Sequence, residues 1–333
     1  MKKIIIIITC LVFTLALFQL NPSPAMAGKK RLVTIASGWV TGCYYPLGGS
    51  ISRILFKHPE YGLRATVESS GASVANANLI ANKDADFAIL QNDIAYYAYN
   101  GIKMFAPGSG KNKPAKNMRA ICTLYPEYVQ IQALKKSNIK TPADLRGKKV
   151  CVGPLGSGTE VNAKQILEIY GMTFKDLGKV ERLTARESSD FLKDGRIDAA
   201  FYTVGVGAAV LVDTAMMTPC TIVHIDDEHA KKLIKKYPFY AQFPIKAGTY
   251  KGLDKDVKTV AILAMLVTRA DIPEKVVYNF TKAIFENLKT IHKAHATLKQ
   301  VTLDTAMDGM SIPLHPGAKK YFKEKGVKIP AGF

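Results

Sequence analysis

Residues 37–50 read Ser-Gly-Trp-Val-Thr-Gly-Cys-Tyr-Tyr-Pro-Leu-Gly-Gly-Ser, a loop of mostly small residues between two apolar segments. A short apolar run, residues 32–36, precedes the loop, and apolar residues at helical spacing from Leu47 to Leu55 follow it. Pro46 lies near the expected helix start, where its missing N–H is not needed. The pattern predicts a strand, a loop and a helix, with backbone N–H groups gathered at the positive end of the helix dipole. We expect this loop to bind an anion or a carboxylate.

The same plan recurs in the second half of the chain. Residues 149–152 form an apolar run, residues 153–159 form a Gly- and Ser-rich loop, and a helical pattern ends at Gly171. Residues 83–90 and 193–202 repeat a further unit, in which a helix end and a tight turn lead into a buried strand. Short apolar strands that alternate with helices indicate parallel sheets covered on both faces. The fold class predicted from this pattern is α/β, with two doubly wound lobes.

Two long extended segments, residues 120–134 and the apolar run 259–268, are suited to cross between the lobes. Two crossings divide the chain into a discontinuous lobe 1, residues 28–126 plus 262–333, and a continuous lobe 2, residues 127–261. A connection of two strands acts as a hinge, which allows the lobes to close on a ligand held in the cleft between them.

Residues 1–27 have the composition of a cleavable signal peptide. Two lysines precede the largely apolar segment 4–20, and Ala25-Met26-Ala27 is a small-x-small cleavage site. A retained membrane anchor is the alternative, but a largely apolar segment of 17 residues is at the short limit for a membrane span. The sequence therefore predicts a periplasmic or secreted protein.

The formal net charge is +19, yet the composition does not indicate a nucleic-acid-binding protein. The lysines are spread over many segments, and neither an Arg-rich helix nor alternating aromatic and basic residues occur. Secretion also separates the chain from nucleic acid. We therefore interpret the charge as solvated basic surface that keeps the protein soluble and attracts anions.

Four cysteines follow the signal peptide: Cys43, Cys122, Cys151 and Cys220. None has C-x-x-C spacing, and three lie in apolar runs, so buried free thiols are expected and one disulfide is left open. A nucleophilic Cys43 would make the protein an enzyme on the same scaffold. No histidine lies near Cys43 in the sequence, so we expect no catalytic residue. The sequence also contains no metal-ligand spacing, and no cofactor is expected.

Ligands of doubly wound sheets bind outside the carboxyl ends of the strands, which locates the candidate ligand-binding residues. They are Ser37, Gly38, Trp39, Thr41, Gly42, Cys43 and Tyr44 after the first strand, Gln91 and Asp93, Tyr125 and Glu127, Ser157, Gly158 and Thr159, and Tyr202. Backbone N–H groups and hydroxyls at 37–45 and 157–159 would hold a carboxylate, with the ring of Trp39 as an apolar wall.

The remaining candidates would set orientation and selectivity: Gln91, Asp93, Tyr125, Glu127 and Tyr202. Asp93 or Glu127 would accept an ammonium group of the ligand. Ser157 has a second interpretation as a simple helix cap, because 157–160 match the S-x-x-E capping box. Arg182 or Arg186 would pair with a second ligand carboxylate, and a solvated surface role is the alternative for both.

Several motifs together resemble the TAXI family, the solute receptors of one class of TRAP transporters. They are 37–50, Glu68-Ser69-Ser70-Gly71-Ala72-Ser73-Val74-Ala75-Asn76, Gln91-Asn92-Asp93, Leu124-Tyr125-Pro126-Glu127, 153–159, Tyr237-Pro238-Phe239-Tyr240, Ala247-Gly248-Thr249-Tyr250 and Pro313-Leu314-His315-Pro316-Gly317-Ala318. The resemblance covers nearly all of the chain after the signal peptide, in order. It implies a periplasmic-binding-protein fold of type II-like architecture.

The resemblance also implies a function. Members of this family deliver small carboxylates, including glutamate-like amino acids and dicarboxylates, to membrane permease subunits driven by an ion gradient. Two departures bear on the ligand: Trp39-Val40 replace a Gly/Thr-rich run, and Ala72 lies where the family often has Gly.

We therefore predict an extracytoplasmic solute-binding receptor, a monomer, for a TRAP-type permease. A sensory binding module that docks on a membrane receptor is the alternative from another class, and an enzyme on the same scaffold is a third.

Overall fold

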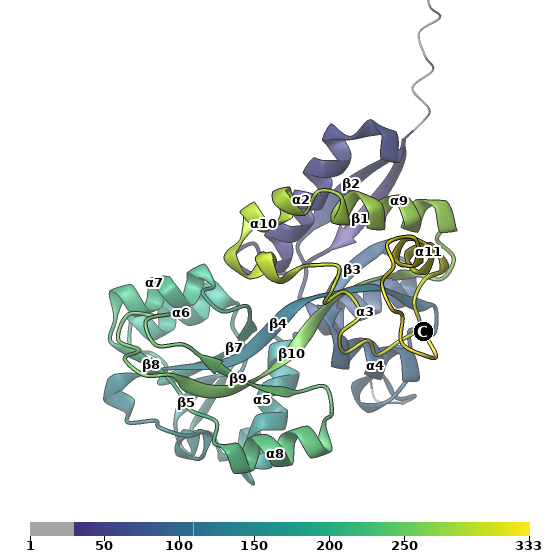
Figure 1. Ribbon diagram of the computed structural model, residues 1–333. Coiled ribbons are helices and arrows are strands. Elements are labelled where there is room, and N and C mark those ends of the chain that lie inside the picture. Colours follow the sequence, from purple (N-terminus) through teal and green to yellow (C-terminus); the bar gives the residue numbers. More distant parts are fainter. Residues whose placement is uncertain (1–29, 109) are drawn as a thin grey trace, which may run out of the picture.

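The computed structural model describes residues 30–108 and 110–333. The predicted signal peptide, residues 1–27, lies outside the described residues. Figure 1 shows two groups of helices and strands, which we name lobe 1 and lobe 2, joined by two long strands.

Lobe 1 contains both terminal parts of the described chain. Its strands are β1 (Arg31–Ala36), β2 (Leu63–Glu68) and β3 (Phe87–Gln91). Its helices are α2 (Tyr44–Lys57), α3 (Ser73–Asn82), α4 (Asn92–Asn100), α9 (Glu274–Phe285), α10 (Leu288–Ala294) and α11 (Pro316–Glu324), with short 3-10 turns η2 (Pro59–Tyr61), η3 (Lys103–Phe105) and η7 (Ala296–Gln300). The predicted strand, loop and helix around residues 37–50 are therefore β1, a turn and α2.

Lobe 2 is built from the middle of the chain. Its strands are β5 (Lys149–Cys151), β6 (Lys179–Glu181), β7 (Ala199–Val204), β8 (Cys220–Ile222) and β9 (Ala241–Ile245). Its helices are α5 (Gly158–Ile169), α6 (Ala185–Lys193), α7 (Ala209–Met217) and α8 (Asp227–Lys236), with 3-10 turns η4 (Lys135–Ser137), η5 (Pro142–Leu145) and η6 (Phe174–Asp176).

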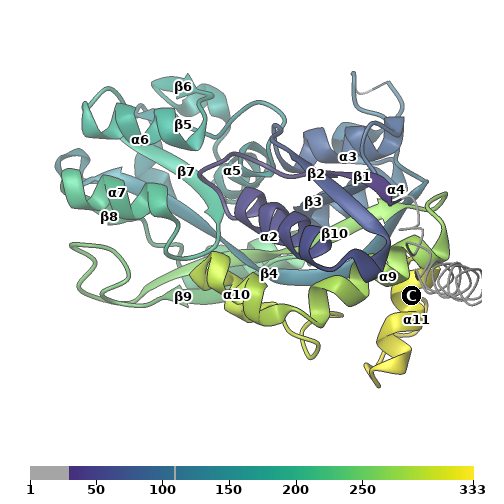
Figure 2. The ribbon, with the colours of Figure 1, turned by 90° about the horizontal axis from the view of Figure 1, so that it is seen from above.

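The two segments predicted to cross between the lobes are single long strands, β4 (Met118–Leu134) and β10 (Val257–Arg269). They pair antiparallel with each other, and Figures 1 and 2 show them side by side between the two lobes. The sheet order is β2-β1-β3-β10-β4-β7-β5-β6, so one continuous sheet runs through both lobes. The predicted boundaries at 126/127 and 261/262 fall inside β4 and β10, and the division at those residues stays a prediction.

Within each lobe three strands pair in parallel, as the alternation of strands and helices predicts, whereas β8 and β9 pair antiparallel with β4 and β10, respectively. β1 pairs with β2 and β3, and β5 pairs with β6 and β7, all in parallel. The carboxyl ends of parallel strands share one edge of a sheet, so the loops after β1 and β3 gather in lobe 1, and those after β5 and β7 gather in lobe 2. These two sets of loops face each other at the junction of the lobes.

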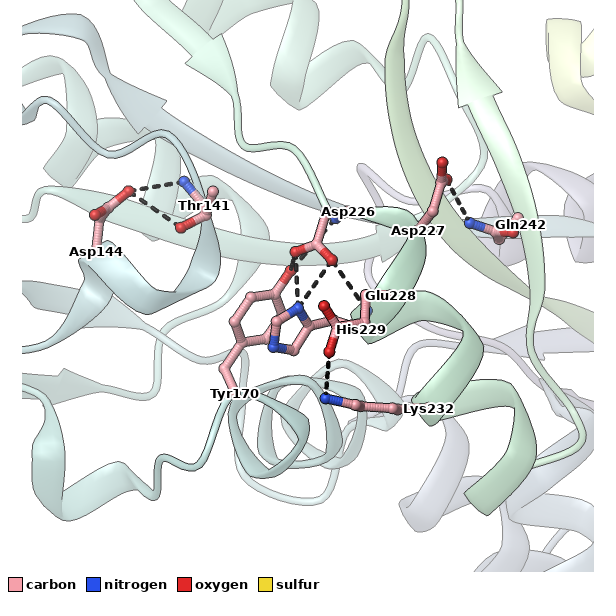
Figure 3. A network of polar contacts seen from close by, with 9 residues as sticks. All are labelled: Thr141, Asp144, Tyr170, Asp226, Asp227, Glu228, His229, Lys232 and Gln242. Atoms are coloured by element: carbon pink, nitrogen blue, oxygen red, sulfur yellow. Dashed lines mark hydrogen bonds and ion pairs between the residues drawn. The ribbon is translucent and has the colours of Figure 1, made fainter.

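Helix α8 illustrates how the helices of lobe 2 are held. Asp226 caps α8 by accepting a hydrogen bond of 3.0 Å from the backbone N–H of His229, and its carboxylate also accepts one of 2.7 Å from the Tyr170 hydroxyl. The His229 ring stacks on the Tyr170 ring with centroids 3.8 Å apart (Figure 3). A capped helix start and a stacked pair join α8 to the end of α5. This cluster of polar side chains is therefore structural.

Candidate ligand-binding site

A cavity lies between the lobes where the loops at the strand ends meet. It is lined by Gly38, Trp39, Gly42, Cys43, Tyr44, Ala72, Ser73, Gln91 and Glu127, and on the lobe 2 side by Gly158, Thr159, Thr203 and Val204. Its volume is only about 30 Å³. That space holds roughly two water molecules, so the lobes as described are closed.

Many of the predicted ligand-binding residues meet at this cavity. They are Gly38, Trp39, Gly42, Cys43, Tyr44, Gln91, Glu127, Gly158 and Thr159. They come from segments far apart in the sequence, and the carboxyl-end rule brings them together. Trp39 forms part of the wall, as its position in a small-residue loop predicts.

Two predicted serines have structural partners instead of facing the cavity. The Ser37 hydroxyl donates a hydrogen bond of 2.7 Å to the Glu68 carbonyl and thereby joins the ends of β1 and β2. The Ser157 hydroxyl donates one of 2.7 Å to the Pro154 carbonyl and accepts one of 3.1 Å from the Glu160 N–H, which makes Ser157 the N-cap of α5. The contacts of Ser157 are therefore those of a helix cap, the second of the two interpretations given above.

Four further predicted residues lie off the cavity lining. Thr41 is exposed and lines a separate surface hollow together with Arg186. Tyr125 is buried beside Cys43, and Asp93 is buried at the start of α4. Tyr202 is buried in β7 and does not line the cavity, whereas the next two residues, Thr203 and Val204, do.

The lining residues that were not among the candidates are Ala72, Ser73, Thr203 and Val204. Ala72 and Ser73 follow β2, a strand that the sequence pattern does not predict, so the carboxyl-end rule gives no candidates there. Thr203 and Val204 belong to the predicted strand end, where the sequence pattern does not separate them from Tyr202. His295 was also missed, although it lies 3.9 Å from the sulfur of Cys43.

The electrostatics of the cavity are set by helix starts and by one carboxyl group. The first turns of α2, α3 and α5 contribute Tyr44, Ser73 and Gly158 to the lining, and a helix start carries free N–H groups and partial positive charge. Among the described residues, Glu127 is the one acidic side chain in the lining, and no Lys, Arg or His belongs to it. The cavity thus combines helix starts, which favour a negatively charged ligand group, with the carboxyl group of Glu127.

Burial raises the pKa values of the two carboxyl groups at this site, those of Glu127 and Asp93. It raises the pKa of Glu127 to about 8, an effect that the nearby Asp93 adds to and the hydrogen bond from Tyr44 opposes. Burial likewise raises the pKa of Asp93 to about 7, against hydrogen bonds from the backbone N–H groups of Asp93 and Ile94. Asp93 Oδ2 is buried without a hydrogen-bond partner. Burial therefore favours the protonated form of Glu127 at this site.

The two arginines considered for a second ligand carboxylate do not reach the cavity. Arg182 pairs with Glu160 through a contact of 2.6 Å. Arg186 lines the outer hollow together with Thr41. Neither provides a cation for a ligand enclosed between the lobes.

The contact between Cys43 and His295 does not form a catalytic pair. Burial, with the nearby Glu127 carboxyl as a second cause, raises the pKa of the Cys43 thiol to about 12. Burial lowers the pKa of His295, and its Nδ1 accepts a hydrogen bond of 3.2 Å from the Thr297 N–H. A neutral thiol beside a neutral imidazole lacks the thiolate that nucleophilic catalysis requires. All four described cysteines are buried and free, as the sequence predicts.

The described residues contain neither a candidate metal site nor a candidate membrane-spanning helix. Residues 30–108 and 110–333 contain no group of three or more His, Cys, Asp and Glu residues that could hold a metal ion. In the same part of the chain, none of the helices combines the length and the apolar character that crossing a bilayer requires.

The fold and the closed cavity define a two-lobed α/β protein of the periplasmic-binding-protein type, with the type II-like arrangement expected from the sequence. The sequence profile of the NMT1-like family matches residues 35–326, so the chain belongs to the NMT1-like family.

Several solved structures are similar to this chain at low sequence identity. A protein of Bordetella bronchiseptica RB50 is 17% identical, with a TM-score of 0.55 and coverage of 91% of both chains. The periplasmic aliphatic sulphonate binding protein SsuA from Escherichia coli is 14% identical, with a TM-score of 0.46 and coverage of 88% of this chain and 83% of that one. A putative L-cystine ABC transporter protein from Listeria monocytogenes is 14% identical, with a TM-score of 0.48 and coverage of 81% and 97%.

Proposed function

We propose that this protein is an extracytoplasmic solute receptor that captures a small carboxylate between its lobes and delivers it to a TRAP-type permease. The observation that carries the proposal is the convergence of three helix starts, at Tyr44, Ser73 and Gly158, on one enclosed cavity. Helix starts bind carboxylates through N–H groups and the helix dipole, without needing a charged side chain. The resemblance to TAXI receptors and the predicted signal peptide support the partner and the location.

Glu127 favours an amino acid over a dicarboxylate as the ligand. A second carboxylate on the ligand would meet Glu127 and the nearby Asp93, with no cation among the described lining residues to compensate. An ammonium group would pair with Glu127 and satisfy it, since opposite charges a few ångströms apart favour the ionised carboxylate. The ligand we propose is therefore zwitterionic, with its carboxylate at the helix starts and its ammonium at Glu127.

Entry of such a ligand requires the lobes to part. A cavity of about 30 Å³ is too small for an amino acid, so the ligand would bind an opened form and the lobes would close again over it. Closure by a two-strand hinge would use bending within β4 and β10, the two strands that connect the lobes.

Isothermal titration calorimetry with a panel of amino acids and matched dicarboxylates tests the proposal. We expect an amino acid to bind, with a proton released at neutral pH, because the ammonium displaces the proton of Glu127. Heats measured in buffers of different ionisation enthalpy report this release. Glu127→Gln should weaken binding and abolish the buffer dependence, whereas Glu168→Gln, a surface carboxyl paired with Lys236, should change neither.

Tight binding of dicarboxylates with no amino acid bound would overturn the proposed ligand class. Absence of binding to every carboxylate in the panel, by protein that melts cooperatively, would overturn the receptor function as stated.

A further inference from the structure

A chain of buried side-chain hydrogen bonds runs from lobe 1 into lobe 2 and back. Gln91 Nε2 donates to Asn162 Oδ1 at 3.1 Å, and Asn162 Nδ2 donates to the Tyr240 hydroxyl at 2.7 Å. The Tyr240 hydroxyl donates to Gln165 Oε1 at 2.5 Å, and Gln165 Nε2 donates to the Tyr97 hydroxyl at 3.4 Å. We name Gln91, Tyr97, Asn162, Gln165 and Tyr240 the interlobe latch.

The latch crosses between the lobes twice. Gln91 ends β3 and Tyr97 lies on α4, both in lobe 1, whereas Asn162 and Gln165 lie on α5 of lobe 2. The crossings are the Gln91–Asn162 and Tyr97–Gln165 bonds. All five side chains are at most 6% exposed, so none of these polar groups has ready access to water while the lobes are closed.

Aromatic packing accompanies the latch on the same side of the cleft. The rings of Tyr96 and Tyr97, from lobe 1, lie 5.1 and 5.7 Å from the ring of Phe239, which precedes Tyr240 in lobe 2. A backbone hydrogen bond of 3.2 Å from the Ala75 N–H to the Gly156 carbonyl adds a third link between the lobes. Opening the cleft would separate these contacts together.

We propose that the interlobe latch holds the lobes closed in the absence of ligand. Apart from Gln91 Oε1, its polar side-chain groups satisfy one another, and the rings of Tyr97 and Tyr240 are removed from water, so closure is favourable without any solute. The lobes open when the two crossing bonds exchange for bonds to water. An amino acid enters only the open form. The apparent ligand affinity therefore falls in proportion to the fraction of ligand-free protein that is open.

Gln91 joins the latch to the cavity. Its Nε2 makes the first crossing bond, while its Oε1 is buried, lacks a hydrogen-bond partner and belongs to a side chain that lines the cavity. A ligand N–H donor at Oε1 would hold the Gln91 amide in the orientation that the latch requires. This coupling, unlike the latch itself, rests on the proposed function.

The test measures the distance between the lobes in ligand-free protein. Single-molecule energy transfer between dyes at Lys57→Cys and Lys231→Cys, both exposed, reports open and closed populations. Tyr97→Phe and Asn162→Leu each remove one crossing bond. Tyr250→Phe is the matched control, because its hydroxyl bonds Gln130 at 2.5 Å within lobe 2 and crosses nothing.

We expect each crossing variant to raise the open-to-closed ratio about fivefold, the effect of losing one net hydrogen bond, and the pair of changes to raise it further. The Tyr250→Phe protein should have the same open-to-closed ratio as the unaltered protein. Equal populations in Tyr97→Phe, Asn162→Leu and unaltered protein would overturn the latch.

Where Asn162→Leu disturbs folding, Gln91→Leu, which removes the same crossing bond from the lobe 1 side, replaces it in the same measurement. No ligand is added at any stage. Failure of amino acids to bind would therefore overturn the proposed function and leave the latch standing.

Discussion

The Tyr44 hydroxyl donates a hydrogen bond of 2.6 Å to Glu127 Oε2, and both side chains are buried in the wall of the interlobe cavity. Tyr44 begins α2, and Glu127 lies in the middle of the connecting strand β4. The bond therefore ties the ligand loop of lobe 1 to the strand that connects the lobes. It also fixes one carboxylate oxygen and leaves the other available to a ligand.

Stability should fall as pH rises, because burial raises the pKa values of Asp93 and Glu127. The folded protein then holds these protons more tightly than the unfolded chain. Their contribution is fully present below the unfolded values and is lost as pH rises through the folded ones, between about pH 4 and pH 8. Asp93→Asn should flatten this dependence and be more stable than the unaltered protein at pH 8. Denaturant unfolding at several pH values measures the effect, and a steeper decline in the variant would contradict it.

Ala72 should be a site where glycine stabilises the protein. Its φ of 71° and ψ of −144° lie in a region that residues with a Cβ rarely adopt. Ala72→Gly removes this strain, which is larger than the added flexibility of the unfolded chain, for a net gain of about 1 kcal/mol. Ala75→Gly, in the regular helix α3, is the control and should be destabilising. A loss of stability in Ala72→Gly would show that the backbone is unstrained there.

A side chain at Gly158 should displace Gln91, because a Cβ there would lie 2.0 Å from Gln91 Oε1. Gly158→Ala forces the Gln91 side chain to move, which breaks its bond to Asn162 and changes the cavity wall. We expect ligand affinity to fall about tenfold or more, in line with the loss of a buried hydrogen bond and a misplaced polar group. In Gly49→Ala, where a Cβ would meet nothing within 4 Å, calorimetry should find the affinity unchanged. Equal affinities in the two variants would refute the steric argument.

Cys43 should be unreactive in the folded protein. With a pKa of about 12, the thiol contains almost no thiolate at pH 8, and its side chain is buried. Mass spectrometry after brief treatment with iodoacetamide should find Cys43 unmodified in native protein and modified in denaturant. Cys43→Ala should retain ligand binding. Rapid alkylation of native Cys43 would instead support the enzyme alternative.

Local patterns in the sequence were sufficient to predict several of the strands and helices and most of the loops that face the cleft. The alternation around residues 37–50 and 149–159 predicts β1 with α2 and β5 with α5, because a buried strand and an amphipathic helix have different apolar periods. The two crossing strands are also visible, since β4 and β10 are unusually long extended segments. Gly38, Trp39 and Gly158 could be named in advance because strand ends in such sheets meet at one edge.

The orientation of individual side chains could not be obtained in this way. Tyr202 and Thr203 are both acceptable at a strand end, and only the folded structure shows that Thr203 lines the cavity and Tyr202 does not. His295 lies 252 residues from Cys43 in sequence, and no local signal joins them. Ser73 could not be named for a similar reason. It follows β2, and the strand character of β2 depends on pairing with β1.

The amino-acid sequence by itself determined the alternation of strands and helices, the two long strands that connect the lobes, and the small-residue loops at the strand ends. These features depend on neighbours in the chain. The tertiary structure alone decided that Glu127 and Asp93 are removed from water, and that Gln91 reaches Asn162, 71 residues away, to connect the lobes. The physical reason is that burial and hydrogen bonding between distant residues arise only when the lobes pack together, and these interactions set the charge and the closure of the site.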